Sequence, residues 1–129
     1  MTLKVLLVED NPVIRENLAA ALEELAPVRI VGFAEDASAA TNWTAANPEG
    51  ADLLVIDIFL RRGSGLEVLR AASKFTKARR VVLSNYATSD MRRKCLELGA
   101  DRVFDKSNEI EALVAYCAHL NGDESSQDT

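Results

Sequence analysis

The sequence has few of the features that mark membrane, secreted or nucleic-acid-binding proteins. No apolar run approaches the ~18 residues of a membrane span, and residues 1–4 lead into a strand-like run rather than a signal peptide. Basic residues are not in excess, because 15 Lys and Arg stand against 20 Asp and Glu and the net charge is −5. Non-specific binding to nucleic acid usually needs a basic face. We therefore expect no direct contact with nucleic acid or membrane.

Cysteine and histidine are also scarce. The two cysteines, Cys95 and Cys117, lack CxxC spacing and stand on the apolar sides of helix-like patterns, so we expect buried, reduced thiols. Reduced thiols indicate the cytoplasm. The single histidine, His119, has no matching acid or nucleophile nearby in sequence, and we expect it at the surface rather than in catalysis. Short basic groups such as Arg61-Arg62 are interpreted as solvated charge.

The chain does contain a regular alternation of apolar runs and helical patterns. Its 129 residues, 48% of them hydrophobic, indicate one ordinary globular domain. Three of the five apolar runs are continuous, which is typical of strands buried on both faces of a parallel sheet. The five predicted strands are residues 3–8, 28–33, 52–57, 80–84 and 102–104.

Helical patterns follow each of these strands. Asn11 can cap the first helix and Pro12 fits its first turn. The apolar stripes that mark the helices are Ile14, Leu18, Ala21, Leu22 and Leu25; Leu66 and Leu69; Met91, Cys95 and Leu98; and Ile110, Leu113, Val114 and Cys117. The second helix, within residues 36–47, has the shallowest apolar face, because its pattern is alanine-rich.

Such β-α alternation implies right-handed crossovers and a parallel sheet covered by helices on both sides. With five strands it predicts an α/β fold of the flavodoxin-like, doubly wound (βα)5 type, with strand order 2-1-3-4-5. We expect this domain to cover residues 1–121. Residues 122–129 are polar and acidic, and they predict a disordered tail.

Polar side chains stand at the carboxyl ends of four predicted strands. Glu9 and Asp10 follow the first strand, Asp57 ends the third, Ser84 ends the fourth and Lys106 follows the fifth. Functional sites of open α/β sheets form beyond the carboxyl ends of the strands, so these side chains should meet at one edge. Each residue alone could be a helix cap, a turn former or a solvated lysine. The five together indicate a site.

The chemistry of this set follows from its charges. Three crowded carboxylates repel one another and need a cation or a raised pKa. Mg²⁺ fits best, because it takes one or two carboxylates, keeps several waters and bridges to phosphate. Asp57 beside Mg²⁺ could attack a phosphoryl group and form an aspartyl-phosphate. Lys106 would then supply positive charge and Ser84 a hydroxyl donor to the transferring group.

These motifs resemble the receiver domain of bacterial two-component response regulators, including those of chemotaxis, from Leu3 to about Leu120. The residues that carry the resemblance are Glu9 and Asp10 in LLVEDN, Asp57 and Gly65 in LLVIDIFLRRGSGLEVL, Ser84 in VVLSNYA, and Phe104 and Lys106 in GADRVFDKS.

The resemblance implies that Asp57 accepts a phosphoryl group from a histidine kinase or phosphotransfer protein. Mg²⁺ would be held by Asp10, Asp57 and the backbone carbonyl of Phe59, with Glu9 acting partly through water. The protein would catalyse its own phosphoryl transfer and a slow dephosphorylation without being a conventional enzyme. A pseudo-receiver, which binds partners without phosphorylation, is the main alternative, although the intact set of five residues argues against it.

The resemblance also implies a switch. Phosphorylation would draw Ser84 towards the new charge, and Phe104 would rotate inward to fill the space behind it. This would alter the face formed by the fourth helix, the fifth strand and the fifth helix, and signal to a downstream protein target or output domain. A homodimer through the same face is a further association that the resemblance allows. Alternatively, Phe104 is a permanently buried core aromatic.

Two positions depart from the family pattern, since Arg61 and Ser107 stand where receivers often carry proline. A cis bond before a non-proline residue costs ~3 kcal/mol. We therefore expect either a trans Lys106–Ser107 bond with an adjusted loop or a strained cis bond. Phe59 and Tyr86 would flank the phosphoryl site, and bulky rings there predict a long-lived phosphoryl group because they obstruct the attacking water.

Two other functions suit the sequence less well. A flavodoxin-like FMN binder would want a hydroxyl-rich phosphate loop after the first strand, whereas this chain has Glu9-Asp10-Asn11-Pro12. An aspartate-nucleophile phosphohydrolase would want an acid two residues after Asp57, where Phe59 stands. The chain is interpreted as a free-standing receiver, with a receiver cut from a longer regulator as the alternative.

Overall fold

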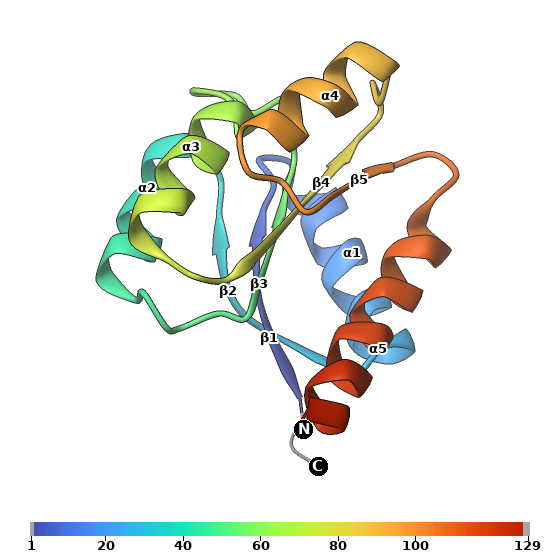
Figure 1. Cartoon of the computed structure of the whole chain (residues 1–129). Coiled ribbons are helices and arrows are strands. Elements are labelled where there is room, and N and C mark those ends of the chain that lie inside the picture. Colours follow the sequence, from blue (N-terminus) through green and yellow to red (C-terminus); the bar gives the residue numbers. More distant parts are fainter. Residues whose placement is uncertain (1, 128–129) are drawn as a thin grey trace.

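Five parallel strands form one sheet in the order β2-β1-β3-β4-β5 (Figure 1). The structure is a computed structural model, which describes the backbone of residues 2–127 and the side chains of residues 2–120. The strands are β1 (Leu3–Val8), β2 (Val28–Ala34), β3 (Leu53–Ile56), β4 (Arg79–Ser84) and β5 (Arg102–Asp105). Each predicted strand boundary is met to within one residue, and the doubly wound fold is confirmed.

Five helices cover the two faces of the sheet. They are α1 (Pro12–Leu25), α2 (Ala37–Ala46), α3 (Gly65–Phe75), α4 (Ser89–Glu97) and α5 (Ile110–Gln127). Helices α1 and α5 lie on one side, and α2, α3 and α4 lie on the other (Figure 1). Asn11 caps α1 as predicted, because its side chain accepts hydrogen bonds from the backbone N–H groups of Val13 and Ile14. Asp36 caps α2, because its side chain accepts a hydrogen bond from the backbone N–H of Ala39.

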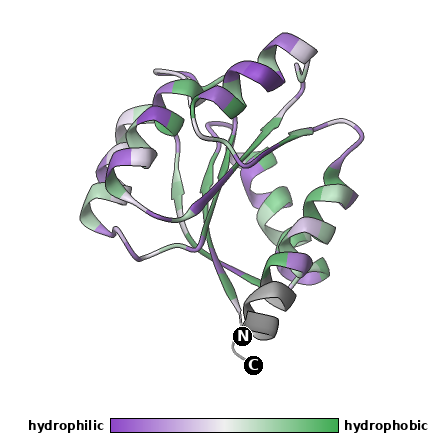
Figure 2. Cartoon of the chain, viewed as in Figure 1, coloured by the Kyte–Doolittle hydropathy of each residue, from purple (hydrophilic) through white to green (hydrophobic). Residues whose placement is uncertain are grey.

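Two apolar cores lie on the two faces of the sheet. Alternate strand residues feed each core, so that Leu54 and Ile56 face α2 and α3 while Leu53 and Val55 face α1 and α5. All four residues of β3 are buried, which explains why the sequence of this strand is continuously apolar. Figure 2 shows hydrophobic residues along the strands and polar ones on the outer sides of the helices.

The two cysteines are buried and free on opposite faces of the sheet, as expected. Cys95 belongs to the core under α4, and Cys117 belongs to the core under α5. Burial raises the pKa of the Cys117 thiol to about 11. His119 is exposed, as predicted.

Helix α5 extends beyond residue 121, where the sequence analysis placed the end of the domain. The backbone is helical to Gln127. No proline interrupts this stretch, and one glycine in a helix costs only about 1 kcal/mol. The domain boundary and the disordered tail stay predictions. The rest of the expected tail, residues 128–129, lies outside the described residues. Among the helices that the structure describes, none is both long and apolar enough to cross a membrane.

Candidate functional site

Asp57 stands at the carboxyl end of the central strand β3. Its backbone N–H donates to the Val8 carbonyl at 3.0 Å, which extends the pairing of β3 with β1. The chain then folds back, because the N–H of Gly65 donates to the Ile58 carbonyl at 2.9 Å. A Cβ at Gly65 would lie 2.3 Å from the Asp57 carbonyl oxygen, so only glycine fits there. Asp57 itself is 9% exposed.

Three carboxylates meet at this edge of the sheet, as predicted. Glu9, Asp10 and Asp57 each offer an oxygen, and these oxygens lie within 4.8 Å of one another. Glu9 is 2% exposed and follows β1, where its N–H pairs with the Ala34 carbonyl of β2 at 3.0 Å. The donors are all hard oxygen atoms, so the set fits a Mg²⁺ ion.

Lys106 joins two of these acids from across the sheet. Its Nζ lies 2.5 Å from Oε1 of Glu9 and 3.3 Å from Oδ2 of Asp57. Its backbone N–H donates to the Ser84 carbonyl at 2.9 Å, one step beyond the last paired residues of β4 and β5. The predicted lysine is therefore brought to the site by the ladder between these two strands.

The electrostatics of the site follow from its burial. Burial raises the pKa of Asp57 to about 6, and the charge of Glu9 adds to this effect while Lys106 opposes it. Burial acts to lower the pKa of Lys106, but the hydrogen bond to Glu9 and the charge of Asp57 outweigh it, so this pKa stands above its ordinary value. Lys106 therefore stays protonated and positively charged at neutral pH. Three carboxylates and one ammonium leave an excess of negative charge that a divalent ion would balance.

Ser84 ends β4, and Phe104 is the last residue but one of the neighbouring strand β5. Ser84 is fully buried, and its hydroxyl accepts a hydrogen bond from the backbone N–H of Tyr86 at 3.0 Å. Phe104 is 1% exposed, and its ring centroid lies 5.9 Å from that of Tyr116 in α5. The guanidinium of Arg102 lies over both rings, at 5.2 and 5.4 Å. We expected Phe104 to move inward on phosphorylation, whereas here it already lies inside, as the core-aromatic alternative describes.

Comparison with known proteins agrees with this geometry. A family model described as the response regulator receiver domain matches residues 5–118. The chain belongs to this family.

The receiver resembles curated regulators and solved structures at modest identity. It is 28% identical over 110 residues to the transcriptional regulatory protein YdfI of Bacillus subtilis. These aligned residues are 85% of this chain and 51% of that protein. The chain thus spans about half the length of this relative. A LuxR-family response regulator from Aurantimonas sp. SI85-9A1 has a TM-score of 0.82 at 27% identity, over 89% of this chain and 81% of that one.

A third likeness is to a response regulator protein from Burkholderia pseudomallei. Its crystal structure contains a phosphorylated aspartic acid, a calcium ion and citrate. The TM-score is 0.75 at 26% identity, over 97% of this chain and 71% of that chain.

The two departures from the receiver pattern lie in loops. Among the described residues there is no cis peptide bond, so Lys106–Ser107 is trans, the first of the two expected outcomes. The carboxylate of Asp105 accepts hydrogen bonds from the Ser107 N–H at 2.8 Å and from its hydroxyl at 2.5 Å. This side-chain turn orders the loop, and sequence reasoning did not foresee it.

The other departure, Arg61, lies beside the acidic cluster. Arg61 and Arg62 are exposed, as expected, and with Asp10, Glu35 and Asp36 they line a cavity of about 140 Å³. Sequence reasoning missed the acids Glu35 and Asp36. They follow β2 directly, so the rule that located the other site residues would have found them.

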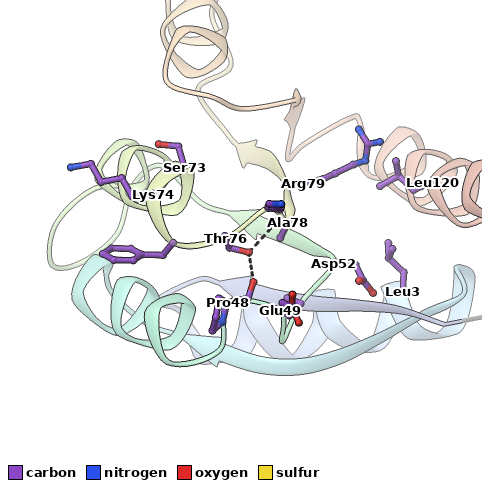
Figure 3. Close-up of a pocket in the computed structure, with 13 residues that line it drawn as sticks. Leu3, Pro48, Glu49, Asp52, Ser73, Lys74, Thr76, Ala78, Arg79 and Leu120 are labelled. Atoms are coloured by element: carbon purple, nitrogen blue, oxygen red, sulfur yellow. Dashed lines mark hydrogen bonds between the residues drawn. The ribbon is translucent and has the colours of Figure 1, made fainter.

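A second cavity, of about 560 Å³, lies at the opposite edge of this receiver (Figure 3). It is lined by residues around the amino ends of β3 and β4, among them Asp52 and Arg79, and by Leu120 of α5. The hydroxyl of Thr76 donates to the Pro48 carbonyl at 2.9 Å and closes one side. This cavity is separate from the cluster around Asp57.

Two exposed aromatic residues, Phe59 and Tyr86, stand two positions after Asp57 and Ser84. They are 56% and 60% exposed, and their ring centroids lie 6.3 Å apart at an interplanar angle of 72°. This edge-to-face pair connects the loops that follow β3 and β4.

Proposed function

We propose that this receiver takes a phosphoryl group onto Asp57 from the phosphohistidine of a histidine kinase or phosphotransfer protein, in a Mg²⁺-dependent step. The observation that carries the proposal is the meeting of Glu9, Asp10 and Asp57 within 4.8 Å, with the Nζ of Lys106 3.3 Å from Asp57. A phosphorylated aspartic acid and a calcium ion in the Burkholderia pseudomallei relative support the same chemistry here.

The carboxylates have separate roles in the ion site. Asp10, Asp57 and the backbone carbonyl of Phe59 would hold Mg²⁺, with Glu9 acting partly through water. When bound, the ion neutralises the carboxylates and the phosphoryl oxygens. This lets an anionic nucleophile approach an anionic donor.

The transfer uses three side chains of the chain. An oxygen of Asp57 attacks phosphorus, the new O–P bond forms, and the P–N bond to the donor imidazole breaks with its electron pair returning to the nitrogen. The ammonium of Lys106 and the hydroxyl of Ser84 stabilise the negative charge on the transferring oxygens. Water later attacks the aspartyl-phosphate slowly, because Phe59 and Tyr86 stand at the rim.

The signal passes through the face made by α4, β5 and α5. Charge on Asp57 draws Ser84 towards it and biases the packing around Phe104, which changes the shape of this face. A downstream protein target or an output domain reads the change, and a second copy of the chain can occupy the same face. Phe104 has no hydroxyl, so its part in the signal rests on packing alone.

Intact-mass measurement tests this function. The protein is incubated with Mg²⁺ and acetyl phosphate, and we expect the mass of one added phosphoryl group. The adduct should be absent from Asp57→Asn and after chelation of the metal. Asp52→Asn is the matched control. Asp52 directly precedes β3, at the edge of the sheet opposite Asp57, and its carboxylate accepts a hydrogen bond from the Lys4 N–H at 2.9 Å.

The alternative is a pseudo-receiver that binds partners without phosphorylation. One observation favours it, namely that Phe104 already occupies its inward position. A wild-type protein that acquires no adduct from any donor would favour this alternative over the proposed function.

A further inference from the structure

Arg92, in the first part of α4, contacts both loops that border the site. Its Nε donates to the Ala87 carbonyl at 3.0 Å, in the loop that follows β4. Its Nη1 donates to the Val103 carbonyl of β5 at 2.8 Å. Its Nη2 lies 2.7 Å from Oε1 of Glu109, just before α5. One guanidinium therefore ties together the loop that follows β4, strand β5 and the residue just before α5.

Glu109 passes this tie on to the loop that carries the lysine. The same Oε1 accepts a hydrogen bond from the Asp105 N–H at 2.7 Å, and the Glu109 N–H donates to the Asp105 carbonyl at 2.8 Å. Asp105 in turn binds the N–H of Ser107. Lys106 is thus fixed on both sides, at residue 105 by Glu109 and at residue 107 by Asp105.

This loop needs such support because Ser107 stands where a proline ring would restrict the backbone. Arginine suits the task, since its planar guanidinium offers donors in a fixed fork, and less freedom is lost per hydrogen bond than with lysine. The side chains of Arg92 and Glu109 are 37% and 34% exposed, so the pair is about two-thirds buried. The hydrogen bond from Arg92 lowers the pKa of Glu109 below its ordinary value.

We propose that Arg92 and Glu109 are positioning residues for phosphoryl transfer, and that the pair holds the loop of Lys106 against the loop that follows Ser84. The inference rests on the proposed function. Arg92 donates a hydrogen bond to the carbonyl of Ala87, three residues after Ser84. Glu109 accepts a hydrogen bond from the N–H of Asp105, one residue before Lys106. The geometry of a reacting site is sensitive to such support, because a misplacement of about 1 Å by a remote substitution can cost about 100-fold in rate.

The test compares Arg92→Ala and Glu109→Ala with the wild type in uptake of phosphoryl from acetyl phosphate. The rate constant at saturating Mg²⁺ and donor is followed by intact mass. We expect each variant to be about 10-fold slower and the double variant no slower than the slower single one, because both break the same tie. The Mg²⁺ dissociation constant, measured by calorimetry, should change by less than about 2-fold, because the carboxylate cluster is untouched.

Arg93→Ala is the matched control. Arg93 is the next residue of the same helix, its side chain is 71% exposed, and it pairs with Asp90 at 3.4 Å on the surface. This variant should phosphorylate at the wild-type rate. Conservative changes add a second readout. Glu109→Gln keeps an acceptor for the Asp105 N–H and should recover part of the rate. Arg92→Lys should stay slow, because its donors share one nitrogen and cannot reach the three acceptors that the separate nitrogens of the guanidinium contact.

Three results would overturn the inference: variants with wild-type rates, losses that multiply in the double variant, or a rate loss matched by an equal loss of Mg²⁺ affinity. If Arg92→Ala does not fold, the two Glu109 variants carry the test. A wild-type protein that takes up no phosphoryl group refutes the proposed function and this inference with it. A wild type that reacts normally beside unaffected variants refutes this inference alone.

Discussion

Replacing Asp57 with asparagine should make the metal-free receiver more stable, although it removes the proposed nucleophile. Burial raises the pKa of Asp57 to about 6 from its ordinary value of 3.8, with Glu9 adding to the effect and Lys106 opposing it. The folded protein therefore holds this proton more tightly than the unfolded chain does. Stability is lost as the pH rises from about 3.8 to about 6, and the loss is complete above that range.

The size of the effect follows from the two pKa values. With 1.36 kcal/mol for each tenfold difference in proton affinity, ionised Asp57 costs the fold about 3 kcal/mol at about pH 8 and about half as much at about pH 5. Its side chain is 11% exposed, so solvent screening reduces this little. Asparagine has a similar shape, and its oxygen can still accept the hydrogen bond that Phe59 now donates at 3.2 Å.

Urea unfolding in a chelating buffer measures this difference directly. Asp57→Asn should gain about 3 kcal/mol at about pH 8, or on the order of 10 °C in Tm, and the gain should halve near pH 5. Added Mg²⁺ should narrow the gap, because the wild type binds the ion more tightly. Asp52→Asn serves as the control, since Asp52 lies at the other edge of the sheet. A variant that is less stable than wild type at about pH 8, or a gain independent of pH, would refute the reasoning.

Two further predictions concern the loops around Asp57. Gly65→Ala should lower the free energy of unfolding by about 2 kcal/mol or more, measured by urea unfolding. The new Cβ would lie 2.3 Å from the Asp57 carbonyl oxygen and 2.7 Å from the Cα of Ile58. An unchanged midpoint would show that the backbone moves there at little cost. Tyr86→Ser should speed loss of the phosphoryl group several-fold, measured by intact mass after removal of the donor. Stability should change by less than about 0.5 kcal/mol, because Tyr86 is 60% exposed. An equal rate of loss would show that the Tyr86 ring does not obstruct the attacking water.

The strands and the position of the site were predictable because both depend on short-range pattern. A continuous apolar run such as residues 53–56 can only be buried on both faces, and the structure has it so. Once the strands are parallel, their carboxyl ends share one edge, and this alone brings Glu9, Asp57 and Lys106 together. The sequence therefore identified the charged groups without any knowledge of distances.

Long-range side-chain contacts were not predictable in the same way. Nothing in the sequence links Arg92 to Glu109, because the contact depends on where α4 ends up relative to the loop before α5. The inward position of Phe104 is equally a packing outcome, decided by contacts with Tyr116 and Arg102. Composition also gave no sign that the backbone of α5 stays helical to Gln127.

The burial of Asp57 explains both why the acidic site lowers the stability of the fold and why the loop of Lys106 needs support. Asp57 is held in a setting where its charge is unfavourable, and that same setting makes a cation or a phosphoryl group with its ion a favourable addition. Lys106 partly offsets the cost, but only while its ammonium stays within 3.3 Å of Asp57 rather than turning to solvent. A lysine held by four flexible carbons needs a loop that does not move, and in this chain serine replaces the proline that often stiffens it. The Arg92–Glu109 pair fixes the backbone on the near side of that lysine, which is why a partly exposed ion pair outside the acidic cluster should govern the rate of chemistry within it.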